Sequence, residues 1–327
     1  MTGGVVLALD GGGTKCRAVL VDPRAGVVGR GRAGACNPHS VGDERALAAL
    51  REAIAGACAG GVPGGRLERV VCGLAGVDTP AGAARGEALV RQALGDLGLS
   101  AGEVLVENDA LVVLRGLAPG GEGLIAVAGT GSVVYARHQG RTVRVGGWGH
   151  RVGDEGSGLA IAQAALAAVY RAWDGYGEET ALVAALCRAV GAADPVALQE
   201  WLYRPETGLE DIAGLAPVVA EVAAAGDAVA GAILAEAGAR LATLAATAAR
   251  RSGLAGVPGF PALATGGVLR HSRPVQEAFF KKLKELCPAA RPEVLAEEPV
   301  LGAALLALGG IEKVPPELVQ RLREQLA

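Results

Sequence analysis

The sequence predicts an α/β protein built from two duplicated halves. In the first half, apolar strands at 69–76 and 103–109 flank a helical pattern at 87–98, which is typical of a layer of parallel strands. Residues 124–147 then repeat the layout of residues 5–31: an apolar strand, a Gly/Thr turn, a second strand, a short turn and a third strand. A chance similarity of two glycine hairpins is the alternative to a duplication. The 327 residues are enough for about two domains, each with its own core.

The remaining elements of the first half follow from local patterns. Three runs rich in β-branched residues, separated by glycine or Asp-Pro turns, predict an antiparallel meander with strands at 5–9, 16–21 and 26–31. Apolar residues recur at helical spacing from Asp43 to Cys58, and Asp43 stands in the N-cap position. The parallel layer follows this helix.

The second half is mostly helical after its meander. It contains a long Ala-rich amphipathic pattern at 227–250 and a strand-like segment at 261–267. The closing segment starts with prolines suited to a helix N-terminus. We expect a first domain at 1–116 and a second at 117–311, with a closing helix at 312–327 able to pack back on the first.

Composition excludes several classes of function. With 31 Lys plus Arg against 34 Asp plus Glu, the net charge is −3, so the chain lacks the basic field that nucleic acids and membrane surfaces require. The longest uncharged stretch, 252–269, contains two prolines and five glycines and cannot span a membrane. The N-terminus lacks the pattern of a signal peptide, so we expect a cytoplasmic protein. The six cysteines form no CxxC pair, which argues against zinc, iron–sulfur and thioredoxin-type sites.

The first candidate for chemistry is DGGGTK, residues 10–15, at the end of a buried strand. A glycine-rich backbone can turn successive N–H groups toward one phosphate, and Thr14 and Lys15 can add donors. Asp10 could then hold Mg²⁺ through water. A tight hairpin turn capped by Asp10 is the plainer interpretation. The segment is not a P-loop, because GxxxxGK[ST] is absent, and not a Rossmann fingerprint, because a strand follows it.

Two further turns extend this pattern. Gly129-Thr130-Gly131-Ser132 repeats the same chemistry, and two such hairpins in duplicated halves would face one another across a cleft, with a triphosphate between them. In a third turn, Thr265-Gly266-Gly267, a strand ends in small residues that could lie against a nucleoside. The three turns together indicate ATP, although a plain αβ corner also explains the third.

Asp109 ends the strand pattern EVLVEND and begins a helix. Its carboxylate is therefore expected at the carboxyl end of a parallel strand, where α/β sheets place ligand chemistry. Such a group can accept the proton of a hydroxyl that attacks phosphorus. A simple N-cap role is the alternative.

The segment GGWGHRVGDEGSG, residues 146–158, sets Trp148 between glycines and two adjacent carboxylates before a helix. A tryptophan face packs against the apolar face of a sugar, and a carboxylate such as Asp154 accepts from neighbouring hydroxyls. A core tryptophan and a helix-capping carboxylate form the alternative. Asn37, in the turn ACNPH, offers a donor and an acceptor to a hydroxyl, but Asn before Pro is also a turn former.

These motifs resemble those of the actin, sugar kinase and Hsp70 superfamily, in the branch that contains N-acetylglucosamine kinase and the BadF/BadG/BcrA/BcrD ATPases. DGGGTK is similar to the first phosphate motif, AGTGS (128–132) to the second, TGGV (265–268) to the adenosine motif and GGWGHRVGDEGS (146–157) to the sugar-site signature. Order and spacing agree over nearly the whole chain. The resemblance implies two ribonuclease-H-like (actin-like ATPase) domains with an interdomain cleft, and a homodimer.

The resemblance also implies a reaction: transfer of the γ-phosphoryl group of ATP to the 6-hydroxyl of an amino sugar. Asp109 would be the catalytic base and Asp10 the residue that positions Mg²⁺. The implied substrate contacts are Asn37, Asp109, Gly147, Trp148, Gly149 and Asp154. The implied ATP contacts are Gly12, Gly13, Thr14, Lys15, Gly129, Thr130, Ala213, Gly266 and Gly267.

N-acetylglucosamine is the leading acceptor, and glucosamine and N-acetylmuramic acid are the alternatives. The acceptor stays open because LAGVDTP (74–80) and Val145 depart from the pattern associated with an acetyl pocket. A BadF-type ATPase that drives a partner protein is a further alternative, although an activase of that type would need cysteines for a shared cluster. A sensor that binds sugar without phosphorylating it would lack the base, and Asp109 is present. The zinc-bearing cysteine pattern of ROK kinases is absent.

Overall fold

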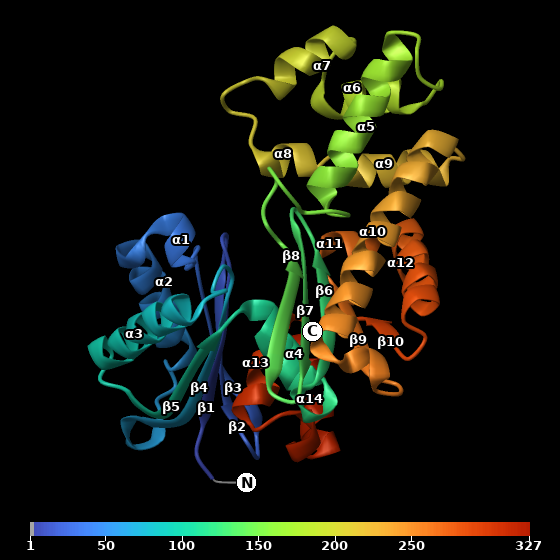
Figure 1. The fold of residues 1–327 in the computed structure, drawn as a ribbon. Coiled ribbons are helices and arrows are strands. Elements are labelled where there is room, and N and C mark those ends of the chain that lie inside the picture. The colour runs from blue at the N-terminus through green and yellow to red at the C-terminus, as the bar shows by residue number, and fades with distance from the viewer. Residues whose placement is uncertain (1–2) are drawn as a thin grey trace. The chain divides into compact units, whose positions relative to one another are not determined.

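The computed structural model describes residues 3–327, which form two compact units (Figure 1). Unit 1 contains residues 3–122 together with Glu297–Ala327, and unit 2 contains Gly123–Ala296. Each unit is built on a five-stranded mixed sheet. Short 3₁₀ turns lie at Pro63–Gly65, Pro119–Gly121, Leu254–Gly256 and Ile311–Lys313.

Unit 1 has the strand order β3-β2-β1-β4-β5, with the first three strands antiparallel and the last two parallel to β1. The strands are β1 (Val6–Gly11), β2 (Cys16–Asp22), β3 (Gly26–Ala33), β4 (Arg66–Leu74) and β5 (Ser100–Glu107). The helices are α1 (Pro38–Val41), α2 (Asp43–Ala57), α3 (Pro80–Asp96), α4 (Asp109–Leu117), α13 (Pro299–Ala307) and α14 (Pro316–Leu326).

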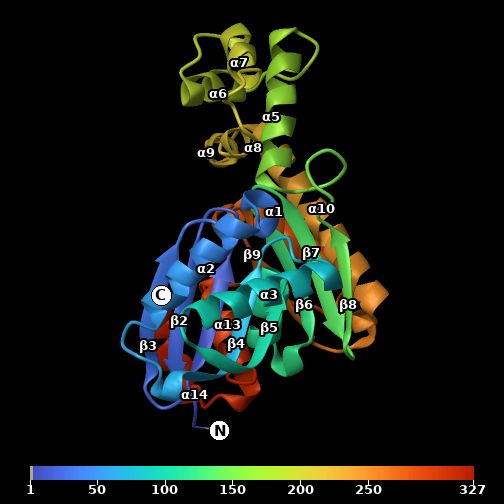
Figure 2. The ribbon, with the colours of Figure 1, turned by 90° about the vertical axis from the view of Figure 1, so that its left-hand side faces the viewer.

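The alternation of side chains along β1 divides the core of unit 1 into two layers. Leu7 and Leu9 pack with α2 and α3, which lie across one face of the sheet in Figure 2. Val6 and Ala8 face the other way and pack with α4, α13 and α14. Asp10 continues the second series, so its side chain belongs to the face that α13 covers.

Unit 2 repeats this topology as β8-β7-β6-β9-β10. Its strands are β6 (Gly123–Ala128), β7 (Ser132–His138), β8 (Arg141–Gly146), β9 (Pro261–Thr265) and β10 (Arg291–Val294). The strands β6, β7 and β8 are antiparallel, and β9 and β10 continue in parallel, as in unit 1. The α/β fold of two duplicated halves that the sequence predicts is therefore confirmed.

The helices of unit 2 are α5 (Gly158–Trp173), α6 (Leu182–Val190), α7 (Pro195–Leu202), α8 (Leu209–Ala213), α9 (Ala216–Ala224), α10 (Ala228–Ser252), α11 (Gly267–His271) and α12 (Arg273–Leu286). Helix α10 is long and apolar enough to pass a length and composition test for a membrane span. It packs on β6, β7, β8 and α12, and its apolar side chains belong to the core of unit 2. Its hydrophobicity is therefore accounted for by internal packing.

Two features differ from the sequence-based expectation. Helix α13, expected within a second domain that ends at residue 311, packs in unit 1 against β1 and α4. Unit 2 accordingly ends at Ala296. Strand β10 was not predicted, because it has only four residues and contains Pro292, which is tolerated at the edge of a sheet.

Candidate functional site

The turn between β1 and β2 is a four-residue loop closed by the pair Gly11 and Cys16 and by a 2.9 Å bond from Gly12 N to Lys15 O. A Cβ on Gly11 would lie 2.4 Å from Cys36 Sγ, so this glycine permits close packing. A Cβ on Gly12 or Gly13 would make only ordinary van der Waals contact, and neither residue has a positive φ. The Gly12 N–H is used within the turn, so the exposed Gly13 is the glycine whose missing side chain leaves the loop backbone accessible.

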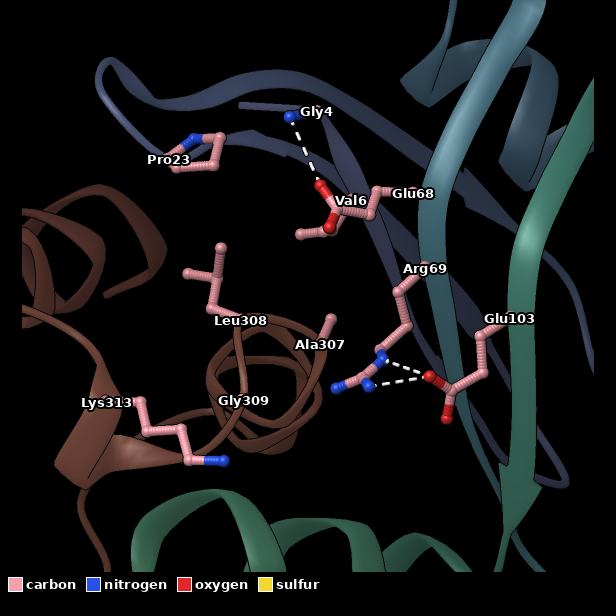
Figure 3. A pocket seen from close by; sticks show the side chains of 10 residues that line it. All are labelled: Gly4, Val6, Pro23, Glu68, Arg69, Glu103, Ala307, Leu308, Gly309 and Lys313. Carbon is pink, nitrogen blue, oxygen red and sulfur yellow. Dashed lines mark hydrogen bonds and ion pairs between the residues drawn. The ribbon is translucent and has the colours of Figure 1, made fainter. Parts of the chain in front are cut away.

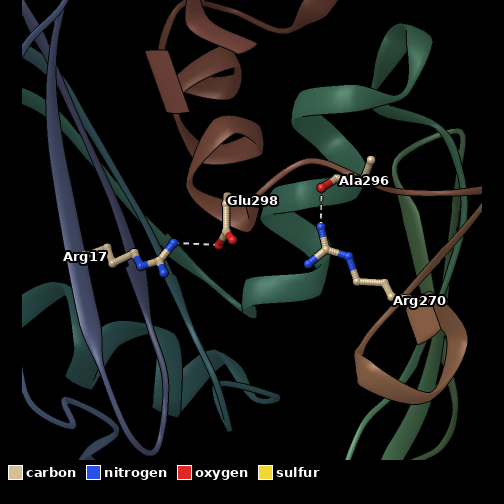
Figure 4. A network of polar contacts seen from close by, with 4 residues as sticks. All are labelled: Arg17, Arg270, Ala296 and Glu298. Carbon is tan, nitrogen blue, oxygen red and sulfur yellow. Dashed lines mark hydrogen bonds and ion pairs between the residues drawn. The ribbon is translucent and has the colours of Figure 1, made fainter. Parts of the chain in front are cut away.

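Asp10 lies beside this turn and faces Arg17 across the β1–β2 ladder. Burial, and after it the nearby charge of Asp109, raise the pKa of Asp10 to about 6 against the lowering effects of Lys15 and Arg17. Arg17 Nη1 lies 2.5 Å from Glu298 Oε2, at the start of α13 (Figure 4). Arg17 therefore bonds the Glu298 carboxylate and not that of Asp10. The Asp10 carboxyl makes no hydrogen bond within residues 3–327.

Asp109 is the first residue of α4, but it is not the N-cap. Asn108 is the N-cap, and its Oδ1 accepts from Ala110 N at 3.0 Å. Burial raises the pKa of the Asp109 carboxyl, and the nearby charge of Asp78 raises it further. Asp109 Oδ1 also accepts from Ala110 N at 2.9 Å. The capping role is therefore filled by a neighbour, which leaves a largely buried carboxylate at the strand end.

Two residues near Asp109 were not predicted. A Cβ on Gly73 would lie 3.1 Å from Asp109 Cα, so only glycine lets the start of α4 approach the sheet here. Gly73 pairs with Asp10 in the β1–β4 ladder, which brings both carboxylates to the same end of the sheet. Asp78 Oδ1 accepts from Asn108 Nδ2 at 3.1 Å. The sequence did contain a signal for Gly73, because a glycine inside an apolar strand often marks the close approach of another segment.

Asn37 lies in the segment that is bonded to the first hairpin of unit 1. It is the N-cap of α1, and its Oδ1 accepts from His39 N at 2.9 Å, so the turn-forming interpretation is correct for this oxygen. Its Nδ2 lies next to Gly76, where a Cβ would approach within 3.1 Å. A bond of 3.2 Å from Cys36 N to Gly12 O joins this segment to the first hairpin. Unit 1 therefore brings Asn37 and the 12–15 turn into one connected loop region.

The second hairpin, in unit 2, is a three-residue turn with a 2.9 Å bond from Gly129 N to Gly131 O. Thr130 at its tip is exposed. The start of α5 approaches this turn closely, because Gly158 N donates to Gly129 O at 2.7 Å.

The predicted nucleotide residues of unit 2 gather around this turn. A Cβ on Gly158 would lie 3.4 Å from Ala213 O and 3.6 Å from Val268 Cγ2. Gly266 has φ +93°, and a Cβ there would lie 2.3 Å from Ala128 O. Gly267 borders open space. Gly129, Ala213 and the 265–268 turn thus surround one small region of unit 2.

Trp148 is 69% exposed, so the core interpretation of this tryptophan is wrong. The flanking Gly147 and Gly149 have φ values of +71° and +85°, which turn the backbone tightly after β8. The guanidinium carbon of Arg144 lies 4.8 Å from the centroid of the Trp148 ring, a cation–π distance. The loop therefore presents an indole to solvent and orients it by contact with Arg144.

Asp154 and Glu155 differ in their surroundings. Asp154 has φ +64°, rare for a non-glycine residue, and its Oδ1 accepts from Ser132 N at 3.4 Å. Glu155 Oε2 is buried and has no hydrogen-bond partner within residues 3–327. Neither residue caps α5, because Ser157 does so by accepting from Ala160 N at 3.1 Å.

A cavity of about 340 Å³ lies elsewhere in unit 1, among the N-terminal ends of β1 and β4 and the residues after α13 (Figure 3). It contains the ion pair of Arg69 Nη2 and Glu103 Oε2 at 2.6 Å and the side chain of Lys313. None of the predicted site residues lines it. It is therefore separate from the carboxylate site at the opposite strand ends.

Comparison with protein families shows which family the chain belongs to. Residues 7–307 match the BadF/BadG/BcrA/BcrD ATPase family. The chain belongs to this family. The matched range includes both glycine hairpins and the Trp148 loop, and membership of an ATPase family makes ATP the nucleotide.

Three relatives of this family member span most of the chain. It is 30% identical to N-acetyl-D-glucosamine kinase of Dictyostelium discoideum over 93% of this chain and 98% of the relative. It is 33% identical to N-acetylmuramic acid/N-acetylglucosamine kinase of Clostridium acetobutylicum over 71% of this chain and 75% of the relative. A solved structure from Chromobacterium violaceum, of a candidate N-acetylglucosamine kinase, shares 25% identity and a TM-score of 0.66, covering 93% of this chain and 99% of the other.

Proposed function

We propose that the protein is an ATP-dependent kinase that transfers the γ-phosphoryl group to the 6-hydroxyl of an amino sugar, with N-acetylglucosamine as the leading acceptor. The observation that carries this proposal is the pair of largely buried carboxylates, Asp10 and Asp109, at one end of the unit 1 sheet, each with a raised pKa. The kinase relatives, which align over 93% and 71% of the chain, support the acceptor class.

Asp109 is the proposed general base. Its raised pKa makes it a stronger base than an exposed aspartate, and its Oδ2 is not used by the α4 cap. It would accept the proton of the sugar 6-hydroxyl as that oxygen attacks phosphorus. Gly73 and Asn108 would fix the position of this carboxylate from the strand and from the cap.

Asp10 is the proposed residue for Mg²⁺. A largely buried carboxyl without a hydrogen bond fits a cation held through water, and Mg²⁺ commonly uses one or two carboxylates, waters and substrate phosphates. When bound, the ion would neutralise charge on the phosphates. The Gly13 N–H of this exposed turn, with Thr14 and Lys15, would orient the transferring phosphate, and Gly12 would let the phosphate approach the backbone closely. Positioning of this kind can lower a barrier by roughly 7–11 kcal/mol.

Unit 2 supplies the other proposed contacts. The exposed face of Trp148 would pack on the sugar ring, and the Asp154 carboxylate would accept from its hydroxyls. Asn37 of unit 1 would add its free Nδ2 donor. The proposed contacts to ATP in unit 2 are Gly129, Thr130, Ala213, Gly266 and Gly267.

The same proposal includes a cytoplasmic homodimer that acts on small molecules rather than on nucleic acid or membranes. The net charge of −3 supports the choice of partners, because both excluded surfaces attract basic proteins. The family name also keeps a second function in view, an ATPase that drives a partner protein.

The decisive experiment measures phosphosugar by mass spectrometry after incubation with Mg-ATP and glucosamine, N-acetylglucosamine, N-acetylmuramic acid or glucose. We expect one amino sugar to give turnover far above glucose. A 6-deoxy analogue of that sugar should bind without forming product. ADP release that is independent of any sugar, with no phosphosugar, would refute the kinase and favour the partner-driving ATPase.

A further inference from the structure

Four hydrogen bonds join the second hairpin to the segment before and within α5. Gly158 N donates to Gly129 O at 2.7 Å, and Leu159 N donates to Thr130 O at 3.3 Å. Ser132 makes the other two bonds. Its backbone N donates to Asp154 Oδ1 at 3.4 Å, and its Oγ donates to Glu155 O at 2.8 Å.

Ser132 is only 4% exposed, and both of its bonds are partly buried. Breaking such bonds costs free energy, because the donor and acceptor groups would then lack hydrogen-bond partners. Ser132 is the first residue of β7 and therefore also part of the sheet. The residue thus links the hairpin, the sheet and the Asp154–Glu155 segment.

Asp154 is held in a strained position by these contacts. A positive φ for a non-glycine residue is unfavourable and persists only when neighbouring contacts enforce it. Gly131 allows the approach, since a Cβ there would lie 3.0 Å from Asp154 Oδ2. The orientation of the Asp154 carboxylate is therefore set by the hairpin.

Unit 1 shows that a hairpin of this kind does not need the hydroxyl. In the corresponding ladder, Cys16 closes the first turn opposite Gly11, as Ser132 closes the second opposite Ala128. Cys16 is fully buried and belongs to the apolar core. The hydroxyl at position 132 therefore serves the link to Glu155 O, next to Asp154, rather than closure of the turn.

We propose that Ser132 is a positioning residue that couples sugar binding to nucleotide binding. This inference rests on the proposed function, since it takes Asp154 as a sugar contact and Thr130 as a phosphate contact. A sugar that orders Asp154 also orders the hairpin through Ser132. Nucleotide binding then loses less conformational entropy, because the hairpin is already ordered. By linkage, the nucleotide strengthens sugar binding by the same factor.

The test is isothermal titration calorimetry with the amino sugar that the wild-type protein phosphorylates, without and with Mg-AMPPNP. We expect the wild-type protein to bind sugar about tenfold more tightly with the nucleotide analogue present, within the usual range of coupling. Ser132→Ala should reduce this factor to about two or less. Ser132→Thr, which keeps a hydroxyl, should restore most of it.

Ser157→Ala is the matched control. It removes a hydroxyl from the same segment and weakens the cap of α5, but it leaves the bonds between hairpin and segment intact. Its coupling factor should stay at the wild-type value. If Ser132→Ala does not fold, Ser132→Cys keeps the side-chain volume with a weaker donor and should show reduced coupling.

Wild-type coupling in Ser132→Ala, or equal loss of coupling in Ser157→Ala, would overturn the inference. Absence of coupling in the wild-type protein would also overturn it. These outcomes leave phosphosugar formation by the wild-type protein untouched. A wild-type protein that forms no phosphosugar with any acceptor would instead defeat the proposed function, and the inference with it.

Discussion

The two sheets have the same topology, but they place different side chains beside their first hairpin. In unit 1 the pair next to the closing residues is Asp10 and Arg17, and in unit 2 the corresponding pair is Val127 and Val133. The closing residue on the second strand is the apolar Cys16 in unit 1 and the hydrogen-bonded Ser132 in unit 2. We infer that a duplicated scaffold has divided its work: unit 1 carries the reacting charges, and unit 2 orients what it binds.

The difference extends to the glycines. A Cβ on Gly12 or Gly13 of unit 1 would make only ordinary van der Waals contact and neither φ is positive, whereas Gly266 of unit 2 has φ +93° and no room for a Cβ. The fold therefore requires Gly266 but not the first pair, for which we propose a role in binding ATP. This contrast can be tested by substitution.

The largest expected effect is at the proposed base. Asp109→Asn should lower kcat by about 10²- to 10⁴-fold with little change in the KM for sugar, because general-base catalysis supplies a factor of this size. Steady-state kinetics on the phosphorylated amino sugar measures both constants. Asp78→Asn is the control, since it removes a nearby carboxylate that is bonded to Asn108. Full turnover in Asp109→Asn would refute the assignment of Asp109 as the base, and with it the inference that unit 1 carries the reacting charges.

The glycine contrast gives the next effect. Gly266→Ala should lower the free energy of unfolding by about 2–5 kcal/mol, because it combines backbone strain with a clash against Ala128 O. Gly12→Ala should change that free energy by less than about 0.5 kcal/mol and raise the KM for ATP about tenfold. Urea unfolding and ATP titration measure the two quantities. Equal destabilisation by both changes would contradict the contrast.

The ionised Asp10 carboxylate should lower the free energy of unfolding at neutral pH. Its folded pKa of about 6 lies above the ordinary aspartate value of 3.8, so its contribution to stability is complete below pH 3.8 and is lost as the pH rises through 6. Asp10→Asn should therefore stabilise the ligand-free protein at pH 8 by about 1–3 kcal/mol while it lowers activity. The gain should shrink at pH 4, where the folded carboxyl is protonated and the unfolded one is only about half ionised. Urea unfolding at the two pH values tests this, and a gain independent of pH would point to another cause.

The smallest effect concerns the exposed indole. Trp148→Ala should raise the KM for sugar by about tenfold and leave the KM for ATP unchanged, because stacking on a sugar ring contributes on the order of 1 kcal/mol. Trp173, 54% exposed on α5, supplies the control variant Trp173→Ala, which should change neither constant. An effect of Trp148→Ala confined to ATP would refute the stacking role.

Much of this arrangement was predictable from local sequence. Strand periodicity located nine of the ten strands because most of their residues alternate or are fully buried, and the repeated Gly/Thr turn revealed the duplication. Helix α13 was assigned to the wrong unit because its contacts with β1 and α4 are long-range, and local patterns carry no such information. The two carboxylates were identified from their positions at strand ends.

Other parts of the site could not be found in the same way. Gly73 matters because a Cβ at this position would crowd the start of α4, a contact that only the folded chain defines. The strain at Asp154 and the bonds of Ser132 depend on two segments that are 22 residues apart in the chain. The sequence indicated that Asn37 could be a turn former or a ligand. The structure shows that its Oδ1 forms the turn, and the ligand role of its Nδ2 stays a prediction.

The central claim is that the carboxylates of unit 1 direct the γ-phosphoryl group to a sugar hydroxyl. The most direct test is the ratio of phosphosugar formed to ADP released by the wild-type protein with Mg-ATP and an amino sugar. We predict a ratio close to one, with ADP release falling to a low background when sugar is omitted. ADP released at the same rate with and without sugar, and no phosphosugar, would contradict the account.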